Sequence, residues 1–215
     1  MKNLKNYVML FACLLVASMT LTSCLRESFS LNDDDNTQNY KVLTQAEKSQ
    51  VMMAVSGTYT GKMKYYTNST YSSADSVSTS WRITSDSTFV TRFPMEAVEG
   101  FIDGQDNKSD IASIGMVTLK GKTYLGNYML ENYWAQSYYQ LGLEIESVTA
   151  TTASGKTVKI EFYDTGMQLG SYSLVYYPMI EYYSNQSSAY ILIKNIEYEG
   201  MTYPINAPFM LGGKK

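Results

Sequence analysis

The chain is 215 residues long, 45% hydrophobic and formally charged −3, with 17 basic and 20 acidic residues. It contains no histidine, which excludes Ser-His-Asp and Cys-His catalytic groups and every zinc site with a histidine ligand. The mild acidity and the lack of a dense lysine patch exclude the electrostatic surface of a nucleic-acid binder.

The first 23 residues predict a lipoprotein signal peptide. Lys2 and Lys5 give a charged start, and the apolar run to about Met19 is too short for a bilayer core, which needs about 20 residues. Leu21-Thr22-Ser23-Cys24 then resembles the bacterial lipobox, which implies acylation of Cys24 and cleavage in front of it. The alternative is an apolar anchor helix with an incidental cysteine. Because acyl chains such as palmitate bury about 0.8 kcal/mol per methylene, lipid on Cys24 would hold the chain on a membrane.

After cleavage before Cys24 the chain has no free thiol, because Cys13 is removed with the leader and Cys24 carries lipid. Residues 24–42 are polar, include three consecutive aspartates and predict a flexible tether. Residues 43–215 are long enough for one sizeable core and predict a single β-rich domain. This domain opens with Thr44-Gln45-Ala46-Glu47, whose capping-box spacing predicts a short helix through about Ala54.

After the helix, the hydrophobic pattern has a period of two. In Tyr59-Thr60-Gly61-Lys62-Met63 the apolar and polar side chains fall on opposite faces of a strand. The fold class predicted is all-β with a short N-terminal helix, either an antiparallel β-barrel (calycin-like) or a β-sandwich. Alternation leaves both open, since it specifies the buried face and not how the sheet closes. Strands are predicted at residues 57–65, 77–84, 89–93, 111–120, 124–133, 141–149, 157–163, 169–177, 190–198 and 201–205.

Two family resemblances bear on this domain. The lipobox, tether and helix, followed by Val55-Ser56-Gly57-Thr58-Tyr59-Thr60-Gly61 and Trp81-Arg82-Ile83, resemble a Bacteroidetes family of envelope lipoproteins catalogued as a domain of unknown function. That family implies no catalytic residues. Gly57-Thr58-Tyr59 also resembles the Gly-x-Trp start of lipocalin or calycin barrels, with tyrosine replacing tryptophan. The alternative is a glycine needed where the chain passes from helix to strand.

Twenty tyrosines are the most unusual feature of the composition. They form pairs at Tyr65-Tyr66, Tyr138-Tyr139, Tyr176-Tyr177 and Tyr182-Tyr183. In a strand, one ring of each pair faces inward, and the outward ring can stack on a sugar or on another protein. Tyrosine is also simply a good strand former, so the pairs alone do not establish a binding surface.

The acidic residues predict no catalytic or metal site. The segment from Asp103 to Asp110 is rich in oxygen atoms but lacks the alternate spacing of a calcium loop, so a solvated loop is predicted. Glu144 with Glu146, and Glu197 with Glu199, each project from one strand face, whereas a glycosidase normally takes its acid and base from different elements. We expect both pairs to be solvated, and we predict no cofactor.

The sequence therefore predicts a membrane-anchored envelope lipoprotein. We interpret it as a non-catalytic module that binds a glycan, a small apolar ligand or a protein. The alternatives are a carboxylate-dependent glycan hydrolase and a structural envelope component without a ligand. The predicted location is the bacterial cell envelope at the outer membrane, on its periplasmic or its surface face.

Overall fold

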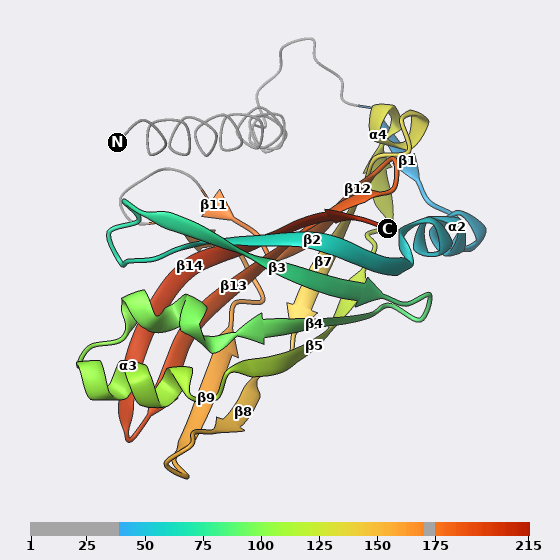
Figure 1. Cartoon of the computed structure of the whole chain (residues 1–215). Helices are drawn as coiled ribbons and strands as arrows, with labels where there is room; N and C mark the ends of the chain where they lie inside the picture. The colour runs from blue at the N-terminus through green and yellow to red at the C-terminus, as the bar shows by residue number, and fades with distance from the viewer. Residues whose placement is uncertain (1–38, 170–174) are drawn as a thin grey trace, which may run out of the picture. The chain divides into compact units, whose positions relative to one another are not determined.

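The computed structural model of the protein describes residues 39–169 and 175–215 (Figure 1). The predicted signal peptide, the lipidation site Cys24 and the predicted tether up to residue 38 lie outside the described residues. The end of the tether range forms a short strand, β1 (Tyr40–Val42), which pairs with β6 (Tyr128–Leu130). Within the described ranges, every helix is too short or too polar to span a bilayer.

Eight antiparallel strands close into a barrel, which confirms the barrel alternative of the predicted fold class. Each of the eight lies beside the one that precedes it in the chain, and the last pairs with the first, so the topology is up-and-down. Leu211 on the last strand stands opposite Met63 on the first. The eight strands are β2 (Gly57–Tyr66), β3 (Ala74–Ile83), β4 (Thr88–Pro94), β5 (Met116–Tyr124), β7 (Tyr139–Ile145), β12 (Met179–Tyr183), β13 (Gln186–Tyr198) and β14 (Met201–Lys214).

The predicted N-terminal helix is present as α2 (Gln45–Val55), and it covers one end of the barrel (Figure 1). The Thr44 hydroxyl accepts the Glu47 N–H at 3.3 Å, and the Glu47 carboxylate accepts the Thr44 N–H at 2.8 Å, which completes the capping box. The hydroxyl of Tyr59 on β2 donates to the Val55 carbonyl. This bond fixes the end of the helix to the first strand of the barrel.

Aromatic rings fill the barrel interior. Tyr59 stacks on Trp81 of β3, with ring centroids 5.5 Å apart and planes inclined by 13°. Phe93 on β4 meets Phe209 on β14 edge to face at 5.0 Å, although β3 and β2 lie between these two strands in the wall. Rings from separate parts of the wall therefore touch across the lumen, and the protein's own side chains occupy it at this level.

A smaller sheet extends from the barrel. The first half of β13 pairs with β12, and its second half pairs with β9 (Thr157–Phe162), with a register shift between Ile193 and Asn195. β8 (Val148–Thr151) continues this sheet beside β9. A 3-10 helix, η1 (Met95–Phe101), and α3 (Gln105–Ala112) lie beside β13 and β14 (Figure 1), where Ile111 is fully buried.

Some predicted strands are wrong in part. The strand predicted at 111–120 begins only at Met116, because Ile111 and Ala112 end α3, and most of the loop predicted from Asp103 to Asp110 is also helix. The segment 105–112 has no apolar stripe, so the sequence pattern does not reveal a helix there. Its side chains instead bond to the neighbouring hairpins, as described below.

Other predicted strands have different bounds. The range 124–133 contains β6 and the first residues of the short helix α4 (Glu131–Ala135), and 141–149 is divided between β7 and β8. Among the described residues, 169–177 overlaps only β11 (Val175–Tyr176). β10 (Met167–Gln168) pairs with β11. β14 continues past Ile205 to Lys214 despite Pro204 and Pro208. Both prolines lie where β14 pairs with β13 alone, before β2 joins at Met210, and proline is tolerated in a strand at such a one-sided position.

Candidate functional site

Three of the four acids in the pairs that the sequence singles out lie beside lysines, and Glu146 is exposed. Glu197 is 3.7 Å from the Lys159 ammonium and Glu199 is 3.2 Å from that of Lys156. Glu144 is exposed on β7 and stands opposite Lys122 of β5. Opposite charges at these distances on an outer sheet surface are ordinary solvent-facing ion pairs.

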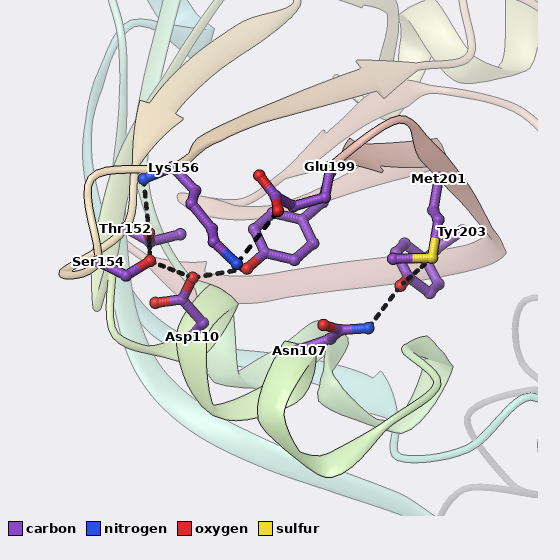
Figure 2. A network of polar contacts seen from close by, with 9 residues as sticks. Asn107, Asp110, Thr152, Ser154, Lys156, Glu199, Met201 and Tyr203 are labelled. Atoms are coloured by element: carbon purple, nitrogen blue, oxygen red, sulfur yellow. Dashed lines mark hydrogen bonds and ion pairs between the residues drawn. The ribbon is translucent and has the colours of Figure 1, made fainter.

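Helix α3 carries a polar network, which we call the α3 clamp and which comprises Asn107, Asp110, Ser154, Tyr198 and Tyr203 (Figure 2). The Asp110 carboxylate accepts the Ser154 hydroxyl and the Tyr198 hydroxyl, both at 2.6 Å. The Asn107 amide donates to the Tyr203 hydroxyl at 2.9 Å. The clamp thus ties α3 to the turn between β8 and β9 and to the β13–β14 hairpin.

The pKa shifts in and beside the α3 clamp favour a structural role over catalysis. The Ser154 hydrogen bond, followed by that of Tyr198, lowers the pKa of Asp110, and the Asp110 hydrogen bond raises the pKa of Tyr198. Hydrogen bonds to Tyr198 and Glu199 raise the pKa of Lys156. These shifts hold each group in its ordinary charge state at neutral pH, whereas a general acid or base needs a pKa near the working pH. No group of three or more His, Cys, Asp or Glu side chains gathers as a metal site in the part of the chain that the structure describes.

The tyrosine pairs only partly follow the predicted alternation. Tyr176 and Tyr182 are buried, while their neighbours Tyr177 and Tyr183 are more than half exposed, as predicted. Tyr65 and Tyr66 are both buried, which contradicts the prediction for this pair. They stand at the end of β2, where the Tyr71 ring packs edge-on against Tyr66 at 5.3 Å and covers the outer member of the pair.

A second polar network lies on the outer wall of the barrel, across β7, β12 and β13. We call it the wall cluster, and it comprises Glu181, Tyr138, Gln140 and Tyr190. The Glu181 carboxylate accepts the Tyr138 hydroxyl at 2.7 Å, the Gln140 amide at 3.3 Å and the Tyr190 hydroxyl at 3.3 Å. The sheet register aligns these groups, since Gln140 stands directly opposite Glu181.

The wall cluster presents a carboxylate with neutral donors. Burial, followed by the negative charge of Glu181, raises the pKa of Tyr138 and of Tyr190, so both hydroxyls stay protonated and can donate. Within the described ranges, no lysine or arginine lies within 4 Å of the Glu181 carboxylate. The negative charge is therefore held by hydrogen bonds and not by an ion pair.

A flat aromatic surface lies beside the wall cluster. Tyr124 at the end of β5 is 53% exposed, and its ring covers Gly142 of β7 so closely that a Cβ atom there would overlap the ring. Gly142 in turn stands opposite Met179 of β12, two positions before Glu181. The missing side chain of Gly142 therefore lets the Tyr124 ring lie flat on the wall next to the polar groups.

The sequence pattern indicates Tyr138 but not Glu181 or Gln140. The available signal is weak: outward polar residues next to tyrosines, as in Tyr138-Tyr139-Gln140 and Glu181-Tyr182. Alternation indicates that these residues share the outer face. It does not indicate that residues 41 and 43 positions apart meet there.

The fold and these networks define a class of protein: an up-and-down β-barrel with a helix over one end and a tyrosine-rich polar cluster on its wall. The chain belongs to the family described as domain of unknown function (DUF4840), whose model matches residues 54–198. The matched range runs from the end of α2 through β13. No curated protein and no solved structure matches the chain.

Proposed function

We propose that the protein is a lipid-anchored, non-catalytic binding module of a bacterial cell envelope, and that its wall cluster binds a hydroxyl-rich ligand such as a glycan. The observation that carries the proposal is the Glu181 carboxylate, held by three neutral donors next to the exposed ring of Tyr124. A rigid set of polar groups beside an aromatic face is the usual composition of a site that orients a small polar ligand.

The chemistry of the wall cluster favours sugars without negative charge. Glu181 can accept sugar hydroxyl groups, Gln140 can donate and accept, and the Tyr124 face can pack on the apolar side of a sugar ring. An acidic sugar would be repelled, because no cation within 4 Å balances Glu181 among the described residues. We therefore expect neutral or amino sugars to bind more tightly than acidic ones.

Two other functions have less support. A carrier of small apolar molecules needs an open lumen, whereas Phe93 and Phe209 meet across the barrel interior. A carboxylate hydrolase needs two acids facing each other across a cleft, whereas Glu197 and Glu199 lie next to lysines. A structural envelope component without a ligand is the alternative that the experiment below separates from a binding module.

Anchoring at the outer membrane, on its periplasmic or surface face, is part of the proposal and is supported by the lipobox resemblance at residues 21–24. Metabolic labelling with radioactive palmitate tests it. We expect label on the native protein and none on the Cys24→Ser variant. Equal labelling of both, or labelling of neither, would contradict the anchor.

Binding at the wall cluster can be tested by calorimetric titration with a panel of neutral, amino and acidic oligosaccharides. Glu181→Gln should weaken the affinity about tenfold or more, because a hydrogen bond to a charged group contributes roughly 1.5–3 kcal/mol. Glu144→Gln is the matched control, since it removes an exposed carboxylate from the neighbouring strand β7. No binding of any sugar, or equal affinity in Glu181→Gln and the native protein, would leave the structural role as the better account.

The aromatic surface has its own test. Gly142→Ala places a methyl group where the Tyr124 ring lies, and the ring can swing outward because it is the exposed end of its side chain. We expect the affinity for the best sugar of the panel to fall while the barrel stays folded. Tyr124→Ala should lower the affinity to a similar degree.

A further inference from the structure

The three most exposed large hydrophobic side chains among the described residues lie at one end of the barrel. They are Met53 on α2, Tyr128 on β6 and Val42 on β1, exposed by 66%, 65% and 63%. Exposed apolar residues scattered singly are normal, whereas a group of them marks an interaction surface.

Hydrogen bonds join the three elements that carry these side chains. The Leu43 N–H donates to the Asn127 carbonyl at 2.9 Å, which places the end of β1 beside the start of β6. The Lys48 ammonium donates to the Asn127 side chain at 2.5 Å, which links α2 to the same segment. Val42 precedes Leu43 in the chain, and Tyr128 follows Asn127, so both lie next to the hydrogen bond between Leu43 and Asn127.

A groove of about 380 Å³ crosses this end of the molecule. Met52 and Met53 of α2 and Leu125 form its apolar walls, Lys48 is its charged residue, and Gln45 and three serines complete it. Among the described residues, no acidic side chain lines the groove. We call the surface formed by Val42, Tyr128 and the groove the α2 face.

The chain enters the domain at the α2 face. β1 begins 16 residues after Cys24, and 16 residues span at most roughly 55 Å. An acyl group on Cys24 would therefore keep the domain within that distance of the membrane surface. Tyrosine suits the boundary between lipid and water, where its ring meets acyl chains and its hydroxyl meets headgroups.

Lys48 of the α2 face has no acidic side chain within 4 Å among the described residues. At the α2 face, Lys41 pairs with Glu47 at 2.8 Å, and Lys48 lies beside a neutral amide. An anionic headgroup could therefore pair with Lys48.

We propose that the α2 face rests in the headgroup layer of the membrane that holds the anchor, with Val42, Tyr128 and Met53 at the lipid boundary. This inference rests on the proposed lipidation of Cys24. It gives the domain a fixed orientation, with α2 towards the lipid and the wall cluster on the side of the barrel.

The test uses the mature, acylated protein in vesicles of phosphatidylethanolamine and phosphatidylglycerol. Because Cys24 is the mature chain's cysteine and carries lipid, single substitutions Val42→Cys, Tyr128→Cys and Met53→Cys can each take an environment-sensitive fluorophore. Met201→Cys is the matched control, because Met201 is 44% exposed. Met201 begins β14, and 13 residues, or roughly 44 Å of strand, separate it from Lys214.

Headgroup spin labels should quench the fluorophore several-fold more at positions 42, 128 and 53 than at position 201. Equal quenching at positions 42 and 201, in protein that floats with the vesicles, would overturn this orientation and leave the anchor standing. Protein that fails to float would overturn the anchor and this inference together. With vesicles of phosphatidylcholine alone, we expect weaker quenching at position 53, next to Lys48, than with anionic lipid.

Discussion

The ammonium group of Lys215 lies 5.0 Å from the ring centroid of Tyr182, at the end of the barrel that α2 covers. The same ammonium lies 5.8 Å from the Tyr59 ring and donates to the carbonyls of Ala54 and Ser56. One side chain at the end of the chain thus joins the helix, the first barrel strand and β12. A cation near the C-terminal carbonyls of a helix is also favoured by the helix dipole.

Replacing this lysine should destabilise the barrel. We expect Lys215→Met to lower the free energy of unfolding by about 1 kcal/mol, because the cation–π contacts and the hydrogen bonds to α2 are lost. Urea denaturation of the variant and of Lys214→Met, which changes the exposed neighbouring lysine, measures the difference. Equal midpoints for the two variants would show that Lys215 does not stabilise this end.

The glycine at position 213 leaves room for the Trp81 ring. A Cβ atom there would overlap the Thr60 carbonyl oxygen and would lie 2.9 Å from the Trp81 ring. Since neither the backbone nor the buried indole can move away, Gly213→Ala should cost about 1–3 kcal/mol of stability. Gly212→Ala is the control, because a Cβ atom at that position would meet no described atom within 4 Å, and the variant should unfold at nearly the native denaturant concentration.

The α3 clamp predicts a stability change in acid. The folded-state pKa of Asp110 is lowered, so the folded protein binds fewer protons than the unfolded chain as the pH falls. The contribution of Asp110 is complete above the unfolded-state pKa of about 3.9 and is lost as the pH falls through the lower folded value.

The Asp110→Asn variant tests this pH dependence. The difference in unfolding free energy between the native protein and the variant should be largest near neutral pH and should shrink below about pH 4. Asp106→Asn, on the exposed side of the same helix, controls for the loss of one negative charge. A difference that is constant from pH 7 to pH 3 would contradict the role assigned to the Asp110 carboxylate.

The capping box at the start of α2 predicts a local effect. Thr44→Ala removes the hydroxyl that accepts the Glu47 N–H and should cost about 1 kcal/mol. Ser49→Ala, within the same helix and exposed, should stay within about 0.5 kcal/mol of the native stability. Thermal unfolding of the three proteins by circular dichroism gives the comparison.

Local patterns in the sequence predict the elements that are held by contacts between residues close in the chain. The capping box at Thr44 and Glu47 locates α2 because both partners lie within four residues. Alternation locates β2, β3 and β4 because each has one buried and one outward face. Helix α3 is missed because long-range bonds, such as the one from Asn107 to Tyr203 across 96 positions, hold it in place.

The candidate site is harder to predict for the same reason. Alternation assigns Glu181 and Gln140 to the outer face, but closure of the sheet decides that β7 lies next to β12. Between these neighbours the chain passes through β8, β9, β10 and β11. In the sequence Gly142 indicates only a residue that weakens a strand. The strand register is needed to show that the Tyr124 ring lies over it.

The pairing of β2 with β14 has a consequence for how the protein is made. Lys64 pairs with Met210, 146 residues later, so β14 must be synthesised before the barrel can close. Until then the nascent polypeptide carries an open sheet edge, and contacts this distant in sequence form slowly. The barrel therefore closes only after β14 has been made, and a chain without residues 204–215 would leave β2 without the partner that closes the wall.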